Sequence, residues 1–136
     1  MRCGTGAAVA SESPKRLCVL VVDDQPDAAD TVATLLSLMG YDARAAYSGR
    51  QALQLFNELQ PRVVLMDLGM PEMSGFEAAA RIRLMPQGTA TTIVALTAWG
   101  DEMNRRIARE ASIDYHVVKP AAAETLQEVL GRIRIH

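Results

Sequence analysis

The sequence predicts an α/β domain in which a parallel sheet of five strands carries helices on both faces. The first observation is a set of short, continuous apolar runs without polar alternation, which is typical of strands buried on both faces. The second is the regular alternation of these runs with segments whose apolar residues repeat at helical spacing. The third is a composition with 49% hydrophobic but only 4% aromatic residues. Such a composition favours helices packed on a sheet over an aromatic-rich β-sandwich.

The chain begins its regular structure with a strand, a helix and a second strand. Residues 17–23 form a β-rich apolar run. Pro26 suits the first turn of the following helix, and Gly40 ends it. The expected inward face of this helix comprises Ala28, Val32, Leu35, Leu36 and Met39. Residues 41–47 predict a second, weaker strand.

The middle of the chain repeats the pattern. Ser48 and Gln51 form a capping box, which opens a helix whose shared face holds Ala52, Leu55, Phe56 and Leu59. Residues 62–67 predict the third strand, residues 74–84 a helix and residues 91–97 the fourth strand.

The last part of the chain predicts a helix at residues 100–111, a strand at 113–118 and a helix at 121–133. The final helix turns Leu126, Val129, Leu130 and Ile133 inward. Small and polar residues dominate positions 1–15, which we expect to be a flexible leader or linker, and residues 16–136 are expected to form one domain.

Composition excludes several classes of partner. The formal charge of −2 gives no electrostatic capture of nucleic acid or of an anionic membrane surface. No apolar run approaches the roughly 20 residues of a membrane span, and no secretory signal is evident, so we expect a cytoplasmic protein. Two cysteines, Cys3 and Cys18, are too few for a disulfide framework. Cys18 is expected to pack as a small hydrophobic residue, and both cysteines fit a reducing compartment.

Polar side chains lie at the carboxyl ends of four of the predicted strands: Asp23, Asp24, Asp67, Thr97 and Lys119. Because the carboxyl ends of parallel strands meet at one edge of a sheet, we expect these side chains to lie together. Each of them alone is typical of a loop or a helix cap. The complete set, in order on separate strand ends, indicates a site.

Three carboxylates brought together repel one another, and each needs a raised pKa to stay neutral. A divalent cation removes this conflict, and Mg²⁺ prefers oxygen ligands, usually one or two carboxylates together with water. We expect Asp24 and Asp67 to bind Mg²⁺ (or Mn²⁺) directly and Asp23 to act directly or through water. The backbone carbonyl of Gly69 completes the protein's expected share of ligands.

The expected site suits phosphoryl transfer. A cation, the Lys119 ammonium and the Thr97 hydroxyl together can hold the anionic oxygens of one phosphoryl group. An aspartate carboxylate is a competent nucleophile toward phosphorus. Its acyl phosphate is labile, whereas a serine phosphate ester is long-lived, so Asp67 suits a timed signal.

Four motifs make the sequence similar to the response-regulator receiver domains of bacterial two-component signalling, whose fold is chemotaxis-regulator-like and flavodoxin-like. These motifs are VVDD at 21–24, MDLGMPEMSG at 66–75, LTAWG at 96–100 and VVKP at 117–120. Their spacing also matches the family, since Thr97 stands 30 residues and Lys119 stands 52 residues after Asp67. The similarity extends from about Leu17 to the end of the chain.

The resemblance implies a doubly wound sheet with strand order 2-1-3-4-5. It implies that Asp67 is the phosphoacceptor, that Asp23 and Asp24 bind Mg²⁺, that Thr97 is the switching hydroxyl, and that Lys119 is the ion partner, followed by a cis bond to Pro120. It also implies a histidine kinase or histidine phosphotransfer protein as phosphodonor, in phosphorelay signal transduction, with an unidentified output partner. The domain is then no enzyme and assists only its own phosphorylation and dephosphorylation.

Three positions depart from the family pattern. His116 stands where relatives often carry tyrosine or phenylalanine, while Tyr115 is expected on the opposite face of the strand. His116 is either a switch residue coupled to Thr97 or a half-exposed strand residue without that role. Gly69 offers no side chain that shields or orients attacking water. Trp99 is either a contact anchor or a lid packed on its own domain.

Three alternatives to a free-standing phosphorylation switch stay open at this point. One is a receiver domain excised from a hybrid histidine kinase. Another is a Mg²⁺-dependent aspartyl-phosphate hydrolase, which Gly69 disfavours because such enzymes carry a second aspartate there. The third is an interaction module that is never phosphorylated, against which the complete set of site residues argues.

Overall fold

The structure is a computed structural model, and it describes residues 17–97 and 113–135. The five strands are β1 (Cys18–Val22), β2 (Asp42–Ala46), β3 (Val63–Asp67), β4 (Thr92–Thr97) and β5 (Tyr115–Val118). The helices are α1 (Pro26–Leu38), α2 (Gly49–Leu59), α3 (Gly75–Arg83) and α5 (Ala123–Ile135). The expected leader at residues 1–15 and the expected helix at 100–111 lie outside the described residues.

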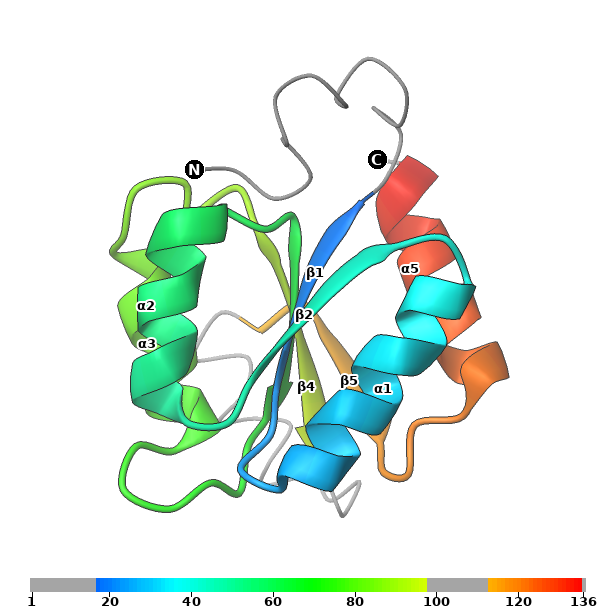
Figure 1. The fold of residues 1–136 in the computed structure, drawn as a ribbon. Coiled ribbons are helices and arrows are strands. Elements are labelled where there is room, and N and C mark those ends of the chain that lie inside the picture. Colours follow the sequence, from blue (N-terminus) through cyan, green and yellow to red (C-terminus); the bar gives the residue numbers. More distant parts are fainter. Residues whose placement is uncertain (1–16, 98–112, 136) are drawn as a thin grey trace.

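All five strands are parallel, and their order is β2-β1-β3-β4-β5. Helices α2 and α3 cover one face of the sheet, and α1 and α5 cover the other (Figure 1). The predicted fold class and strand order are therefore confirmed. No helix among the described residues is both long enough and apolar enough to span a bilayer.

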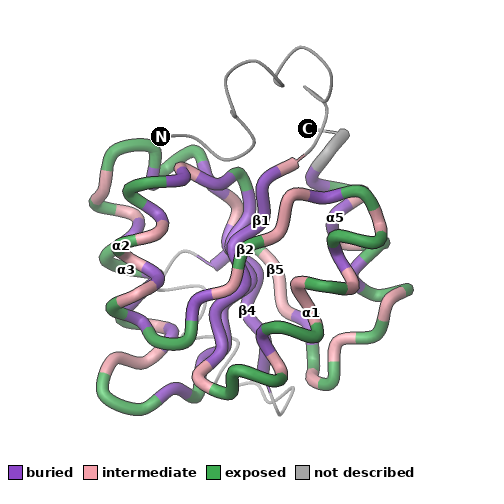
Figure 2. Tube along the Cα trace, viewed as in Figure 1, coloured by how far each residue is buried: buried purple, intermediate pink, exposed green. Residues whose placement is uncertain are grey.

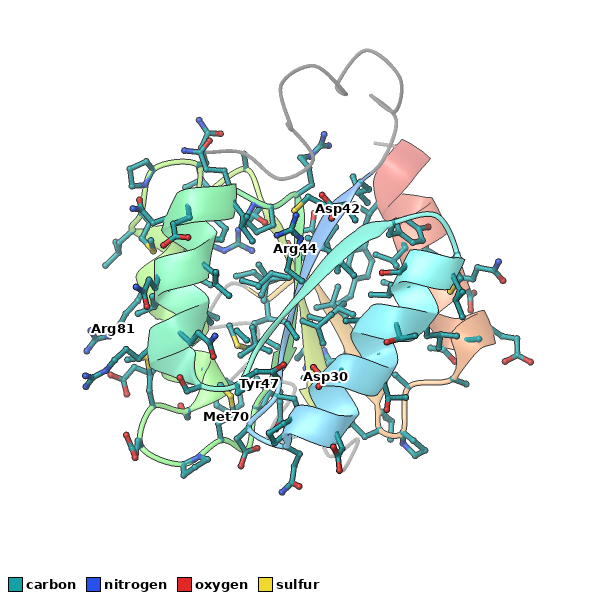
Figure 3. The ribbon with its side chains drawn as sticks, viewed as in Figure 1. Asp30, Asp42, Arg44, Tyr47, Met70 and Arg81 are labelled. Carbon is teal, nitrogen blue, oxygen red and sulfur yellow. The ribbon has the colours of Figure 1, made fainter. Side chains whose placement is uncertain are left out.

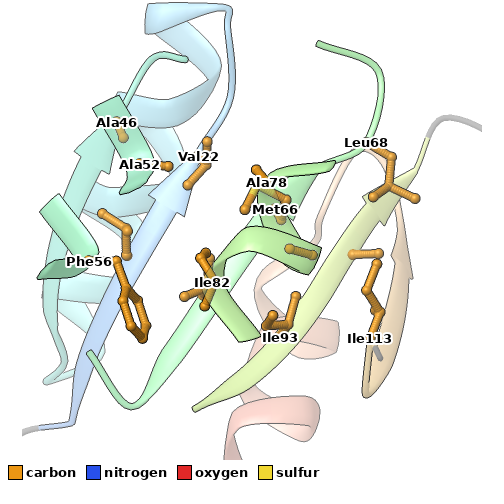
Figure 4. Packing of buried hydrophobic residues seen from close by; sticks show 14 of the residues in the cluster. Val22, Ala46, Ala52, Phe56, Met66, Leu68, Ala78, Ile82, Ile93 and Ile113 are labelled. Carbon is orange, nitrogen blue, oxygen red and sulfur yellow. The ribbon is translucent and has the colours of Figure 1, made fainter. Parts of the chain in front are cut away.

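Each face of the sheet has its own hydrophobic core, and the central strands are buried on both sides (Figure 2). Under α2 and α3, Phe56 and Ile82 pack against the side chains of β1, β3 and β4 that face these two helices (Figure 4). Under α1 and α5, Leu36, Leu126 and Leu130 pack against the alternate residues of the same strands. This double burial explains why these strands are continuous apolar runs.

Several local expectations are met with small shifts. The Ser48 hydroxyl accepts a hydrogen bond from the Gln51 N–H at 3.0 Å, as a capping box requires. The Gln51 side chain, however, accepts from the N–H of Tyr47 at 2.9 Å, one residue before the expected donor. In α1, Ala29 is fully buried, whereas the sequence pattern placed Ala28 on the inward face. Ala29 lies seven residues before Leu36 and therefore on the same helical face.

The strand expected at residues 113–118 begins only at Tyr115. Asp114 precedes it, and the Asp114 side chain accepts the Ile93 N–H at 2.9 Å while its own N–H donates to the Ile93 carbonyl at 2.9 Å. A side chain thus takes the place of the first backbone acceptor of the ladder. The last helix likewise begins at Ala123 rather than at residue 121.

Cys18 is buried, with 5% of its surface exposed. The expectation that it packs in the core is confirmed.

Replacement of Gly75 by alanine tests the contact between α3 and the end of β3. A Cβ at Gly75 would collide with the Asp67 carbonyl oxygen and lie 2.7 Å from the Cα of Leu68, so backbone has to move. We expect Gly75→Ala to lower the free energy of unfolding by about 1–3 kcal/mol in urea denaturation. The control is Gly131→Ala in α5, where the added Cβ has no described atom within 4 Å apart from the neighbouring backbone of its own helix. It should be neutral or stabilising by up to about 1 kcal/mol. Equal effects of the two substitutions would contradict the close approach.

Candidate functional site

The candidate site lies at the carboxyl ends of β1 and β3, where the chain changes the face of the sheet that it covers next. After β1 the chain enters α1 on one face, and after β3 it enters α3 on the other face (Figure 1). Such a switch point leaves a crevice at the sheet edge, which is where α/β proteins bind ligands. Asp23 follows β1 directly, and Asp67 is the last residue of β3.

Three carboxylates meet in this crevice. One oxygen each of Asp23, Asp24 and Asp67 lie within 4.8 Å of one another. Asp23 and Asp67 are only 2% and 7% exposed, whereas Asp24 is half-buried. The three aspartates that the sequence predicts to lie together are thus close to one another in the structure.

Lys119, from the loop after β5, provides the positive charge of the site. Its Nζ donates to Oδ2 of Asp23 at 3.0 Å and lies 3.7 Å from Oδ1 of Asp67. The same Oδ1 accepts the backbone N–H of Gly69 at 3.2 Å. The Lys119–Pro120 peptide bond is cis, as the resemblance implied.

The electrostatics follow from this crowding. Burial raises the pKa of the Asp67 carboxyl above its ordinary value. The Gly69 N–H and the Lys119 ammonium oppose that rise, while the charges of Asp23 and Asp24 add to it. Burial alone would lower the pKa of Lys119, but the hydrogen bond to Asp23 and the nearby carboxylates outweigh it, so that pKa is raised. Lys119 therefore stays charged in a site that carries an excess of negative charge.

This donor set fits a hard divalent cation. Three carboxylates offer oxygen ligands from two neighbouring strand ends, and one ammonium does not neutralise them. Mg²⁺ and Mn²⁺ favour such oxygens and keep water in their remaining positions. Gly69 is held beside Asp67 by the hydrogen bond that its N–H donates to Oδ1. The role of the Gly69 carbonyl as a metal ligand stays a prediction.

Thr97 ends β4 at the same edge of the sheet. It is 4% exposed, and its Oγ1 is buried without a hydrogen-bond partner among the described residues. Buried hydroxyls are usually hydrogen-bonded, so a buried hydroxyl without a bond is able to donate to a group that enters the site. The Lys119 N–H donates to the Thr97 carbonyl at 2.7 Å, which joins the ends of β4 and β5 at the site.

His116 and Tyr115 lie on opposite faces of β5. Tyr115 packs against the core under α1 and α5. His116 is half-buried and stands opposite Ala95, a residue of the other core, in the β4–β5 register. His116 therefore lies on the same side of the sheet as Ala95, two residues before Thr97, and its switching role stays a prediction. Trp99 lies outside the described residues.

Sequence reasoning missed a bonded pair of residues, Tyr47 and Asp30, of which Tyr47 lines the same hollow as Asp24. The Tyr47 hydroxyl donates to Oδ1 of Asp30 at 2.6 Å, which connects the end of β2 to α1 (Figure 3). Tyr47 and Asp24 both line a hollow of about 610 Å³ at this edge of the sheet. The only available signal was a tyrosine as the last residue of a predicted strand, which does not identify its partner.

Known proteins with a similar sequence or structure agree with this geometry. The model of the family described as the response regulator receiver domain matches residues 19–131. The regulatory protein AtoC of Escherichia coli is 35% identical over 115 residues, which are 84% of this chain and 24% of AtoC. The sensor histidine kinase AtsR of Burkholderia thailandensis is 35% identical over 121 residues, 87% of this chain and 20% of AtsR. The chain thus spans a quarter or less of these two relatives.

Two solved structures show the same fold. The chemotaxis protein CheY4 of Vibrio cholerae is 30% identical, with a TM-score of 0.84 over 87% of this chain and 98% of CheY4. The receiver domain of the sensor histidine kinase PA1611 of Pseudomonas aeruginosa is 26% identical. Its TM-score is 0.81 over 89% of this chain and 99% of that domain, which holds a magnesium ion coordinated in its active site cleft. With its matched family model, its strand order and its acidic crevice, this chain belongs to the response regulator receiver domain family.

Proposed function

We propose that the chain is a phosphorylation-controlled signalling switch in which Asp67 accepts a phosphoryl group from a histidine kinase or a histidine phosphotransfer protein. The observation that carries this proposal is the position of Asp67. It is a buried carboxylate at the switch point of the sheet, beside Asp23, Asp24 and Lys119. Membership of the receiver family supports the same role.

Within Asp67, the two carboxylate oxygens have different surroundings. Oδ1 faces the Gly69 N–H and the Lys119 ammonium, and no hydrogen bond from a described residue reaches Oδ2. We assign Oδ2 as the nucleophile. It forms the new oxygen–phosphorus bond while the phosphorus–nitrogen bond of phosphohistidine breaks, and the departing imidazole nitrogen takes up a proton.

Charge neutralisation is the main contribution of the remaining residues. Asp23 and Asp24, together with Asp67, would hold Mg²⁺ or Mn²⁺, which when bound neutralises phosphoryl oxygens. Lys119 lies close enough to Asp67 to contact a phosphoryl oxygen from the other side. Asp23 keeps the Lys119 ammonium in place through their 3.0 Å hydrogen bond.

Thr97 links phosphorylation to the shape of the domain. Its buried hydroxyl lacks a partner among the described residues, and a phosphoryl group on Asp67 supplies an acceptor at the same edge of the sheet. A hydrogen bond formed only in the phosphorylated state shifts the population toward conformations with Thr97 drawn inward. The absence of a side chain at Gly69, where a phosphatase needs a proton donor, supports a switch over a hydrolase.

The first prediction is that acetyl phosphate phosphorylates Asp67. We expect intact-protein mass spectrometry to show the mass gain of one phosphoryl group with Mg²⁺ and none with excess chelator. Asp67→Asn should abolish the gain because the amide is a poor nucleophile. Asp42→Asn, at the start of β2 and therefore at the opposite end of the strand from the crevice, is the matched control and should be phosphorylated as the wild type is. Modification that persists in Asp67→Asn would refute Asp67 as the acceptor.

The second prediction concerns stability without metal. Because its folded-state pKa is raised, ionised Asp67 destabilises the fold above that pKa, and protonation relieves this as the pH falls through it toward the ordinary value of 3.8. Asp67→Asn should therefore be more stable than the wild type at pH 7, by on the order of 1 kcal/mol since solvent screens part of the effect. The difference should shrink as the pH falls through the raised pKa.

Urea denaturation with chelator at several pH values measures this difference. Addition of Mg²⁺ at about 100 times its dissociation constant should stabilise the wild type by about 2.7 kcal/mol. Asp67→Asn should gain much less. A variant that is less stable than the wild type at neutral pH would contradict the crowded-carboxylate description.

The third prediction separates phosphorylation from its response. Thr97→Val keeps the shape of the side chain and removes the buried hydroxyl, which has no partner in the part of the chain that the structure describes. The unphosphorylated domain should therefore keep its stability or gain up to about 1 kcal/mol. We expect the variant to accept phosphate from acetyl phosphate. Its β5 amide resonances should move much less on phosphorylation than those of the wild type, as heteronuclear NMR can measure. Shifts as large as in the wild type would remove Thr97 from the switch.

A further inference from the structure

We propose that Tyr47, through its hydrogen bond to Asp30, is a positioning residue that holds the turn of Asp23 and Asp24 in the shape that binds the divalent cation. This inference rests on the proposed function, since it concerns the same metal site. The bond joins residues that lie 17 positions apart in sequence, one after β2 and one on α1. Its 2.6 Å length is typical of a hydroxyl donating to an ionised carboxylate, which is stronger than a bond between neutral groups.

The backbone of Tyr47 is held by a hydrogen bond of its own, separate from the one that its side chain makes. Its N–H donates to Oε1 of Gln51 at 2.9 Å, and the next residue, Ser48, caps α2 through the Gln51 N–H. The backbone of Tyr47 is therefore tied to the first turn of α2. Because the Tyr47 backbone is held, its phenol can fix the position of Asp30. A phenol on an unsupported loop would instead move together with Asp30.

The turn that carries Asp23 and Asp24 is flanked by two hydrogen bonds to residues 46 and 47. At its start, the Asp23 N–H donates to the carbonyl of Ala46, the neighbour of Tyr47, at 3.0 Å. Beyond its end, Asp30 on α1 accepts the Tyr47 hydroxyl. Residues 46 and 47 thus hold the β1 end of the turn by backbone and its α1 end by side chain.

Asp24 is the residue that depends most on this support. Asp23 is tied to Lys119 and accepts the Gln25 N–H at 3.0 Å, whereas Asp24 makes no side-chain hydrogen bond to a described residue. The position of its carboxylate is set by the backbone of the turn. Asp24 and Tyr47 also line the same hollow. A looser turn would cost ordering free energy when the cation binds, and affinity would fall accordingly.

Calorimetric titration of the metal-free protein with Mg²⁺ tests the inference without any phosphoryl transfer. Tyr47→Phe keeps the ring and removes the donor, and Asp30→Ala removes the acceptor. We expect each to weaken Mg²⁺ binding by about two- to fivefold, as the loss of one exposed hydrogen bond implies. The double variant should lose no more than either single variant, because both remove the same bond. The thermal midpoint should change little, since Tyr47 and Asp30 are exposed.

Hydrogen exchange in the metal-free protein gives a second, independent measurement. The amides of Asp23 and Gln25 should exchange faster in Tyr47→Phe, whereas the Ile93 amide at the other end of the sheet should be unchanged. The control for lost charge is Asp27→Ala, an exposed carboxylate on the first turn of α1, closer in sequence to the acid pair than Asp30. It should weaken Mg²⁺ binding less than Asp30→Ala does.

Three results would overturn the inference. These are unchanged affinity and exchange in Tyr47→Phe, additive losses in the double variant, and an Asp27→Ala loss that equals that of Asp30→Ala. A wild type that binds Mg²⁺ but is never phosphorylated on Asp67 would instead refute the proposed function and leave the role of Tyr47 intact.

Discussion

The site depends on an imbalance of charge held at one edge of the sheet. Asp23, Asp24 and Asp67 bring three carboxylates within 4.8 Å, and Lys119 supplies the neighbouring ammonium. Burial keeps water from screening the excess and raises the pKa of the Asp67 carboxyl. A divalent cation would relieve this repulsion, so the acidic cluster could hold such an ion.

The sheet order keeps these charges together. Adjacent β1 and β3 send their helices to opposite faces, so Asp23 and Asp67 meet in a crevice that no helix fills. The backbone behind Asp67 is equally constrained, because Gly75 at the start of α3 packs directly on Asp67 and Leu68. Two hydrophobic cores support this frame from both sides of the sheet. Aliphatic packing thus supplies the stability that the crowded carboxylates remove.

Much of this site was predictable because strand ends are readable from sequence. Asp23, Asp67, Thr97 and Lys119 each follow an apolar run, and parallel strands bring such ends to one edge. The Tyr47–Asp30 bond was not predictable, since its partners are 17 residues apart and neither position has a periodic signal. The late start of β5 has a similar cause, because the Asp114 side chain replaces a backbone acceptor. Hydrogen bonds made by side chains in this way depend on which residues lie close together in the folded chain, and a local sequence pattern does not reveal that.

The crevice and Thr97 share one physical logic. The carboxylates have more negative charge than the described residues neutralise, and the Thr97 hydroxyl has no hydrogen-bond partner among them. Under the proposed function, a cation would satisfy the first need, and a phosphoryl group on Asp67 would offer an acceptor for the second. Because a ligand shifts an equilibrium only by its differential contacts with two states, a hydrogen bond from Thr97 would give the phosphoryl group such a contact. The proposed switch therefore requires no strained backbone at Thr97, only a buried donor that gains its acceptor on phosphorylation.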